Sequence, residues 1–288
     1  MRLNTSTEPK RFPGAFLLFA LASSLFLPVK CLAVSSSNIL NFETGIRTDD
    51  NVTYAAEERD RLSDTVFSFR LTGGQRFQLG RFDSLSAQLD CERNLSRGYE
   101  GLNDLKGGIA AAWWHKFGIG PMKPLLTIGA AASKRDRRYN DLDERRYEFS
   151  AGLRQRLSEK IDITAALEHE THKTRDPVYN GNSGALNLTL GIAAPADARI
   201  QLGYGLRRGD VTWYFTSPTP LSWASMSGLF DMYYIPWYSE TELISATVLY
   251  PLGLKSSAYL GLERHDTTWH TLSYPNNILK AGFNYNFQ

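Results

Sequence analysis

The chain has 288 residues, with 32 Lys and Arg against 30 Asp and Glu. Four of the basic residues and one acidic residue lie within residues 1–33, so the remainder carries 28 basic and 29 acidic residues. This near-neutral balance does not indicate a nucleic-acid partner. Only Cys91 follows residue 33, which excludes an internal disulfide and a cysteine-based zinc site in the rest of the chain.

Residues 1–33 have the pattern of a secretory signal peptide: a polar, basic start, an apolar run over residues 14–27 and small residues near Ala33. The apolar run is shorter than the roughly 20 residues that a membrane-spanning helix needs. We therefore expect export and cleavage after Ala33, with an uncleaved anchor as the alternative. Lys30 stands where a lipoprotein signal requires a small residue, so lipidation of Cys31 is not expected.

After residue 33, apolar residues alternate with polar ones over runs of roughly ten residues, the repeat that an outer-membrane strand shows. In residues 185–193, four apolar side chains would share one face of a strand, and the polar residues between them would share the other. About twelve runs of this kind (10–14) follow one another along residues 34–288. They predict an all-β protein: a transmembrane, antiparallel, up-and-down β-barrel.

The predicted connections alternate in length, which a soluble β-sandwich has no reason to show. Outer-membrane barrels have short periplasmic turns and longer external loops, so we expect both termini in the periplasm. The expected external loops lie near residues 48–63, 94–104, 136–144, 174–183, 209–240 and 265–276.

The last predicted strand carries Phe283, Tyr285 and Phe287 on one face. It resembles the C-terminal signature of bacterial outer-membrane β-barrel proteins, an amphipathic strand that ends in an aromatic residue. Here Gln288 follows the aromatic, whereas the signature usually ends with it. The resemblance implies recognition by the barrel-assembly machinery and a place in the Gram-negative outer membrane, in contact with its lipid and lipopolysaccharide.

The polar faces of the predicted strands carry charges of both signs. We interpret them either as the lining of a narrow pore or as ion-paired ladders that fill the interior. The expected lumen-lining residues are Arg47, Arg70, Lys116, Arg135, Arg146, Arg154, Arg156, Glu168, Glu170, Arg199, Arg207, Glu263 and Lys280.

His169 and Thr171 are the weak candidates for catalysis, because they would share the lipid-facing side of one strand. Their spacing is similar to that of the His and Ser of outer-membrane phospholipase A, but Thr replaces Ser and no Asn partner is evident. We therefore assign no catalytic residue.

Two groups of residues are candidate metal sites. Glu168, Glu170 and His172 could bind a metal with His265 or Asp266, and the acidic residues of 48–63 could bind calcium. A hydrogen-bonded wall and a solvated loop are the simpler interpretations, so no metal or cofactor is expected.

The segment 209–240 is rich in aromatic residues and is longer than an ordinary connection. It could fold into the barrel as a constriction or lid. The interpretation we favour is that two strands extend beyond the membrane and use the aromatic residues for packing. These residues are Trp213, Tyr214, Trp223, Tyr233, Tyr234 and Trp237.

The sequence thus favours a porin-like or channel-like barrel over an enzyme. A lipid- or lipopolysaccharide-modifying enzyme and a closed barrel that acts through its loops are the alternatives.

Overall fold

The structure is a computed structural model that describes residues 35–138, 142–217, 225–227 and 229–287. The predicted signal peptide, residues 1–33, lies outside this part of the chain. Twelve long strands account for most of it: β1 (Ser35–Asp49), β2 (Asp64–Gln78), β3 (Asp83–Ser96), β4 (Asp104–Lys116), β5 (Leu125–Arg137), β6 (Glu144–Arg156), β7 (Ile161–Thr174), β8 (Gly181–Ala193), β9 (Arg199–Phe215), β11 (Met232–Pro251), β12 (Ser256–Trp269) and β13 (Leu272–Asn286).

Short elements complete the description. The strand β10 (Ser225–Ser227) pairs with β11, and the one-turn helices of the described connections are η1 (Glu58–Asp60), η2 (Glu100–Leu102), η4 (Pro177–Tyr179) and η5 (Pro195–Asp197). Within the described residues, no helix has the length and apolar character needed to cross a membrane.

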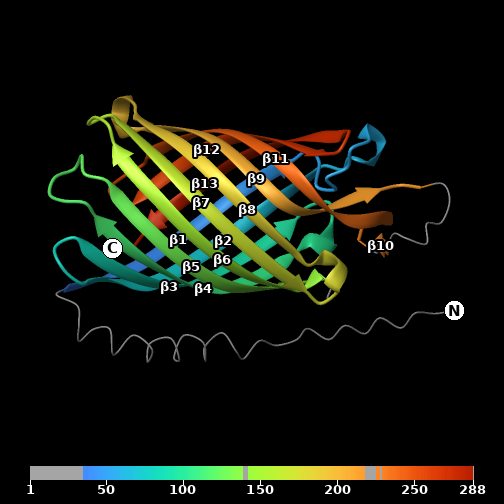
Figure 1. The fold of residues 1–288 in the computed structure, drawn as a ribbon, viewed down its shortest axis with the longest axis horizontal. Helices are drawn as coiled ribbons and strands as arrows, with labels where there is room; N and C mark the ends of the chain where they lie inside the picture. The colour runs from blue at the N-terminus through green and yellow to red at the C-terminus, as the bar shows by residue number, and fades with distance from the viewer. Residues whose placement is uncertain (1–34, 139–141, 218–224, 228, 288) are drawn as a thin grey trace.

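The twelve long strands form one closed antiparallel barrel with strongly tilted strands (Figure 1). Sequence neighbours pair with each other, β9 pairs with β11, and β13 pairs with β1 to close the sheet. In that closing ladder Phe283 lies opposite Thr44, and Tyr285 lies opposite Phe42. The amphipathic last strand predicted from the sequence is therefore the strand that completes the barrel.

Apolar side chains cover the outside of the barrel. One complete row of directly opposed residues runs across β5 to β9: Ile128, Ala151, Leu167, Leu186 and Leu206. Leu167 is 60% exposed and Phe149, one row away, is 59% exposed. A water-soluble protein would bury such residues, whereas a barrel in a bilayer presents them to acyl chains. Because side chains alternate along a strand, the residues between them face the interior.

Glycines on the inner face make room for a large aromatic side chain. Tyr259 on β12 lies over Gly282 on β13 and Gly45 on β1, and a Cβ atom at Gly282 would come within 2.5 Å of the Tyr259 ring. The Tyr259 hydroxyl donates a hydrogen bond to Glu43 on β1, at 3.2 Å. One side chain therefore ties β12 to β1 across β13, at the seam of the barrel.

Six hairpin connections lie at one end of the barrel, which we call the loop end. They are the connections β1–β2, β3–β4, β5–β6, β7–β8, β9–β11 and β12–β13. The five remaining turns lie at the other end, which we call the turn end. The start of β1 and the last residues of β13 also lie there. In Figure 1 the loop end, with β10, is on the right.

Two of the six predicted loops are wrong in extent. Segment 209–240 is mostly strand, since β9 continues to Phe215 and β11 begins at Met232, with Tyr233 opposite Phe215. Segment 265–276 is a tight hairpin, because β12 and β13 continue to a turn at residues 270–271, where His270 has a φ of 49°. Aromatic and β-branched residues favour strands, and here they extend the ladders past the point where polar alternation ends.

Candidate functional site

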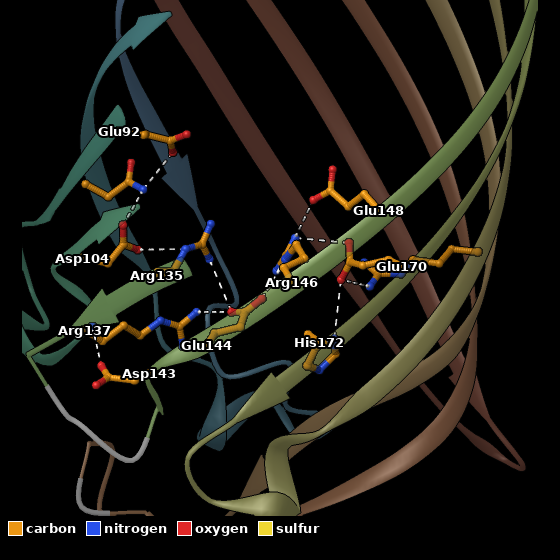
Figure 2. Close-up of polar contacts among 12 residues, drawn as sticks. Glu92, Asp104, Arg135, Arg137, Asp143, Glu144, Arg146, Glu148, Glu170 and His172 are labelled. Atoms are coloured by element: carbon orange, nitrogen blue, oxygen red, sulfur yellow. Dashed lines mark hydrogen bonds and ion pairs between the residues drawn. The ribbon is translucent and has the colours of Figure 1, made fainter. Parts of the chain in front are cut away.

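A belt of charged residues follows the inner face of the wall near the loop end (Figure 2). It starts at Arg70 on β2, whose guanidinium lies 3.3 Å from Glu92 on β3. Asn94 donates hydrogen bonds to both Glu92 (2.9 Å) and Asp104 on β4 (3.0 Å), and so links the two carboxylates. Asp104 in turn lies 3.6 Å from Arg135 on β5.

Glu144 is the centre of the belt. This carboxylate, only 6% exposed, lies 2.7 Å from Arg146, 3.6 Å from Arg137 and 3.9 Å from Arg135. The three arginines come from β5 and β6, so Glu144 holds the two strands together at their loop ends. A buried carboxylate of this kind depends on its cationic partners, because desolvation opposes its charge.

Glu170 on β7 continues the belt. It lies 3.2 Å from Arg146, 3.5 Å from His172 and 3.7 Å from Arg207 on β9. The belt therefore crosses from β2 to β9. The lumen candidates that it joins are Arg70, Arg135, Arg146, Glu170 and Arg207. Asp104, Arg137 and Glu144 were not among the predicted lumen residues, because they fall in segments predicted to be loops. Extending the alternation by one further polar position on β5 and β6 includes Arg137 and Glu144.

Two smaller clusters complete the inner face. Near the turn end, Asp162 on β7 binds Arg154 at 3.2 Å and also pairs with Arg199 of β9. On β12 and β13, Glu263 lies 2.6 Å from Lys280 and 3.5 Å from His265.

Four other lumen candidates lie at inner positions of their strands but form no ion pair with another described residue. They are Arg47, Lys116, Arg156 and Glu168.

A cavity of about 440 Å³ lies beside the belt. Small residues of β4 to β6, among them Gly129 and Ser150, leave this space open, and Glu148 and Glu168 reach it from β6 and β7. The interior is therefore polar and partly open along this wall.

An aromatic cap gathers the connections at the loop end. Tyr214 and Tyr234 of the β9–β11 hairpin are 8% and 4% exposed and pack with Tyr179, Leu142 and Met232. Tyr179 comes from the β7–β8 connection and stacks on Tyr234, with ring centres 4.4 Å apart. Burial raises the pKa of the Tyr179 hydroxyl.

Phe230 extends the cap to the opposite side of the barrel mouth. Its ring contacts Tyr214 at 4.8 Å and Tyr99 of the β3–β4 connection at 5.3 Å. The β9–β11 hairpin thus reaches loops from several other hairpins, which a hairpin that projected straight into water would not do.

The other face of the same hairpin is also packed. Trp237 stacks on Trp269 with ring centres 3.5 Å apart, and Trp213 meets Tyr274 edge to face at 4.7 Å. Tyr233 packs against Phe215 within the hairpin. The predicted loop aromatics therefore belong to strands β9 and β11, apart from Trp223, which lies outside the described residues.

The β1–β2 connection is fastened to this hairpin. Asp60 accepts hydrogen bonds from the backbone N–H (2.9 Å) and hydroxyl (2.6 Å) of Thr216, and the backbone of Tyr214 donates to Thr53 at 3.2 Å. Asp50 accepts from Asn277 of β13. Acidic residues of the 48–63 segment thus serve as acceptors that fix the loop.

The weak catalytic candidates do not form a nucleophile–base pair. The Thr171 hydroxyl donates to Asn182 on β8 at 2.8 Å, and in the described part of the chain no hydrogen bond joins it to His169. The structure supplies an Asn neighbour that the sequence did not reveal, but Asn182 contacts the hydroxyl rather than the imidazole.

The residues considered for a metal are separated. His172 and Glu170 lie on β7, whereas His265 contacts Glu263 on β12 and Asp266 binds Arg264. Over the described ranges, no group of three or more His, Cys, Asp and Glu side chains is arranged to hold a metal ion.

Comparison with known proteins places the fold. Neither a family model nor a curated relative matches the sequence. A solved outer membrane channel from Pseudomonas putida F1 is similar in structure, with a TM-score of 0.59 and 13% identity over 89% of this chain and 98% of that one.

Two further solved structures align over most of their length. An anion-selective porin from Comamonas acidovorans has a TM-score of 0.42 and 10% identity over 88% of this chain and 99% of its own. The KdgM porin has a TM-score of 0.45 and 12% identity over 86% and 99%. The likeness to the Pseudomonas channel shows the fold, which is that of the bacterial outer-membrane β-barrels.

Proposed function

We propose that the protein is a narrow outer-membrane channel whose inner wall carries the Arg and Glu side chains described above. The observation that supports this most directly is the contrast between the two faces of one closed sheet. The outer face is apolar and exposed, whereas the inner face is polar, charged and bordered by a cavity of about 440 Å³. Polar interiors of this kind conduct water and solutes in barrels.

In the proposed orientation, the loop end faces the cell exterior and both termini lie in the periplasm. The short turns near residues 79–82 and 157–160 support this, since periplasmic connections are short in outer-membrane barrels. The aromatic cap then lies at the external mouth, where it narrows the entrance.

The inner charges favour anions. Counting ion-paired residues of the belt alone, five arginines (Arg70, Arg135, Arg137, Arg146 and Arg207) stand against five carboxylates (Glu92, Asp104, Glu144, Glu170 and Glu148, which lies 3.9 Å from Arg146). Near the turn end, by contrast, the described inner residues include the cations Lys116, Arg154, Arg156 and Arg199 and the carboxylate of Asp162. A surplus of fixed cations raises the local concentration of anions and lowers that of cations.

Planar-bilayer recordings of the purified protein test the proposal. We expect discrete single-channel currents and a reversal potential in a salt gradient that shows anion preference. If no current flows at any voltage while circular dichroism shows that the barrel is folded, the channel proposal is excluded. A closed barrel that acts through its loops is then favoured.

A further inference from the structure

Three basic residues lie side by side on the outer face at the loop end. Lys134 on β5 is directly opposite Arg145 on β6, and Arg145 is directly opposite Lys173 on β7. All three are exposed. Lys134 pairs with Asp136 at 2.5 Å, whereas Arg145 and Lys173 form no ion pair with any described residue. Like charges at directly opposed positions destabilise a sheet, and in the described part of the chain only Lys134 of this row has an ion-pair partner.

A polar row lies next to the basic row, one step closer to the middle of the barrel wall. Tyr147, Thr171 and Asn182 are directly opposed on β6, β7 and β8. The Thr171 hydroxyl and the Asn182 amide are joined at 2.8 Å on the exposed surface. Tyr147 is 43% exposed, as expected of an aromatic residue at a membrane interface.

An apolar groove of about 730 Å³ follows below this polar row. Phe149, Leu167, Leu186 and Leu206 line it, and Gly184 leaves its upper part open because nothing lies within 3.4 Å of the position that a Cβ atom would take there. His169 and Arg208 stand at its rim. The apolar lining of this open groove suits contact with acyl chains.

We infer that this surface, from Lys134–Arg145–Lys173 to the groove at Gly184, binds a phosphorylated glycolipid of the outer leaflet, the lipid A part of lipopolysaccharide. The order of the three zones carries the inference: cations for phosphate, a hydroxyl and an amide for sugar, then a groove for acyl chains. Charge complementarity selects an anionic lipid, since basic surface pockets bind anionic headgroups. The choice of leaflet rests on the proposed orientation, with the loop end outside.

The test is lipid binding by the full folded barrel in detergent, followed by native mass spectrometry. The probes are diphosphorylated lipid A, dephosphorylated lipid A and phosphatidylglycerol. The row variant combines K134Q, R145Q and K173Q. A matched control, R81Q with K255Q and R264Q, removes the same charge from other exposed positions.

We expect lipid A to bind one to one, with affinity reduced by about tenfold or more in the row variant and little changed in the control. A second variant, Gly184→Phe, fills the groove and should weaken binding of lipid A without any change in charge. Binding of dephosphorylated lipid A or phosphatidylglycerol as tight as that of lipid A would overturn the inference. So would a row variant that binds like the wild type, or a control that loses as much.

Discussion

Asp162 and Arg199 form an ion pair across a strand to which neither belongs. Asp162 lies on β7 and Arg199 on β9, and between them β8 contributes Gly191. A Cβ atom at Gly191 would lie 3.0 Å from the carboxylate, and closer still to the guanidinium. The missing side chain is therefore what allows the two charges to meet.

Gly191→Val should separate this pair and lower the free energy of unfolding by about 1–3 kcal/mol. The shift of barrel mobility on gels after heating, followed against temperature or urea, measures the loss. Gly107→Val is the matched control, because a Cβ atom at Gly107 on β4 has nothing within 4 Å. Equal losses in both variants would contradict the role given to Gly191.

Glu144→Gln should destabilise the loop end of the barrel by about 3 kcal/mol, because it leaves three arginines without their common carboxylate. Urea unfolding checks the value. Glu148→Gln provides the comparison, since Glu148 is 44% exposed and has one ion pair at 3.9 Å, so its loss should be below about 1 kcal/mol. A larger effect at Glu148 would show that the belt is not centred on Glu144.

The turn-end cations should set ion preference. Lys116→Gln combined with Arg156→Gln removes two inner charges that form no ion pair with a described residue, so folding should be little affected and the anion-to-cation permeability ratio should fall towards unity. Reversal potentials in a KCl gradient give the ratio. Lys160→Gln with Lys255→Gln removes two charges from the turns at the same end and should leave the ratio within experimental error. A ratio unchanged in the first variant would place selectivity elsewhere.

The aromatic cap should limit conductance. Tyr179→Ala removes the ring that stacks on Tyr234 and should loosen the β9–β11 hairpin, so that single-channel conductance or its fluctuation increases. Tyr204→Ala is the control, because Tyr204 is a lipid-facing residue of β9 with 41% exposure. If Tyr179→Ala and wild-type channels behave alike, the cap does not narrow the pathway.

Strand number and closure could be predicted from sequence because alternation is a local signal. Within residues 185–193, for example, the polarity of each residue alone predicts the face of the strand on which it lies. The ends of the strands could not be predicted in this way. Trp213 and Trp237 break the polar–apolar pattern, since one face of the extended hairpin packs on the ends of β12 and β13, and its other face packs on Tyr179 of the β7–β8 connection. Burial of that kind depends on contacts between distant segments, which a two-residue period does not encode.

The sequence could predict that inner Arg and Glu side chains form ion pairs, but not which residues pair with which. Arg146 and Glu170 lie on neighbouring strands, as in the ion-paired ladders that the sequence suggests, whereas the link between Arg207 and Glu170 skips β8. Long arginine side chains reach such partners when the intervening positions are small. Registers between strands decide this, and the sequence does not state them.

The ladder that joins β1 to β13 spans nine opposed residues, from Asn41–Asn286 to Asp49–Ile278, whereas the β1–β2 ladder spans fifteen. Until those nine pairs form, two open sheet edges would meet hydrocarbon, where unsatisfied amides are costly. A partly synthesised chain has no last strand with which to close this ring. We therefore expect stable insertion into the bilayer to require β13, Leu272–Asn286, the strand that pairs with β1.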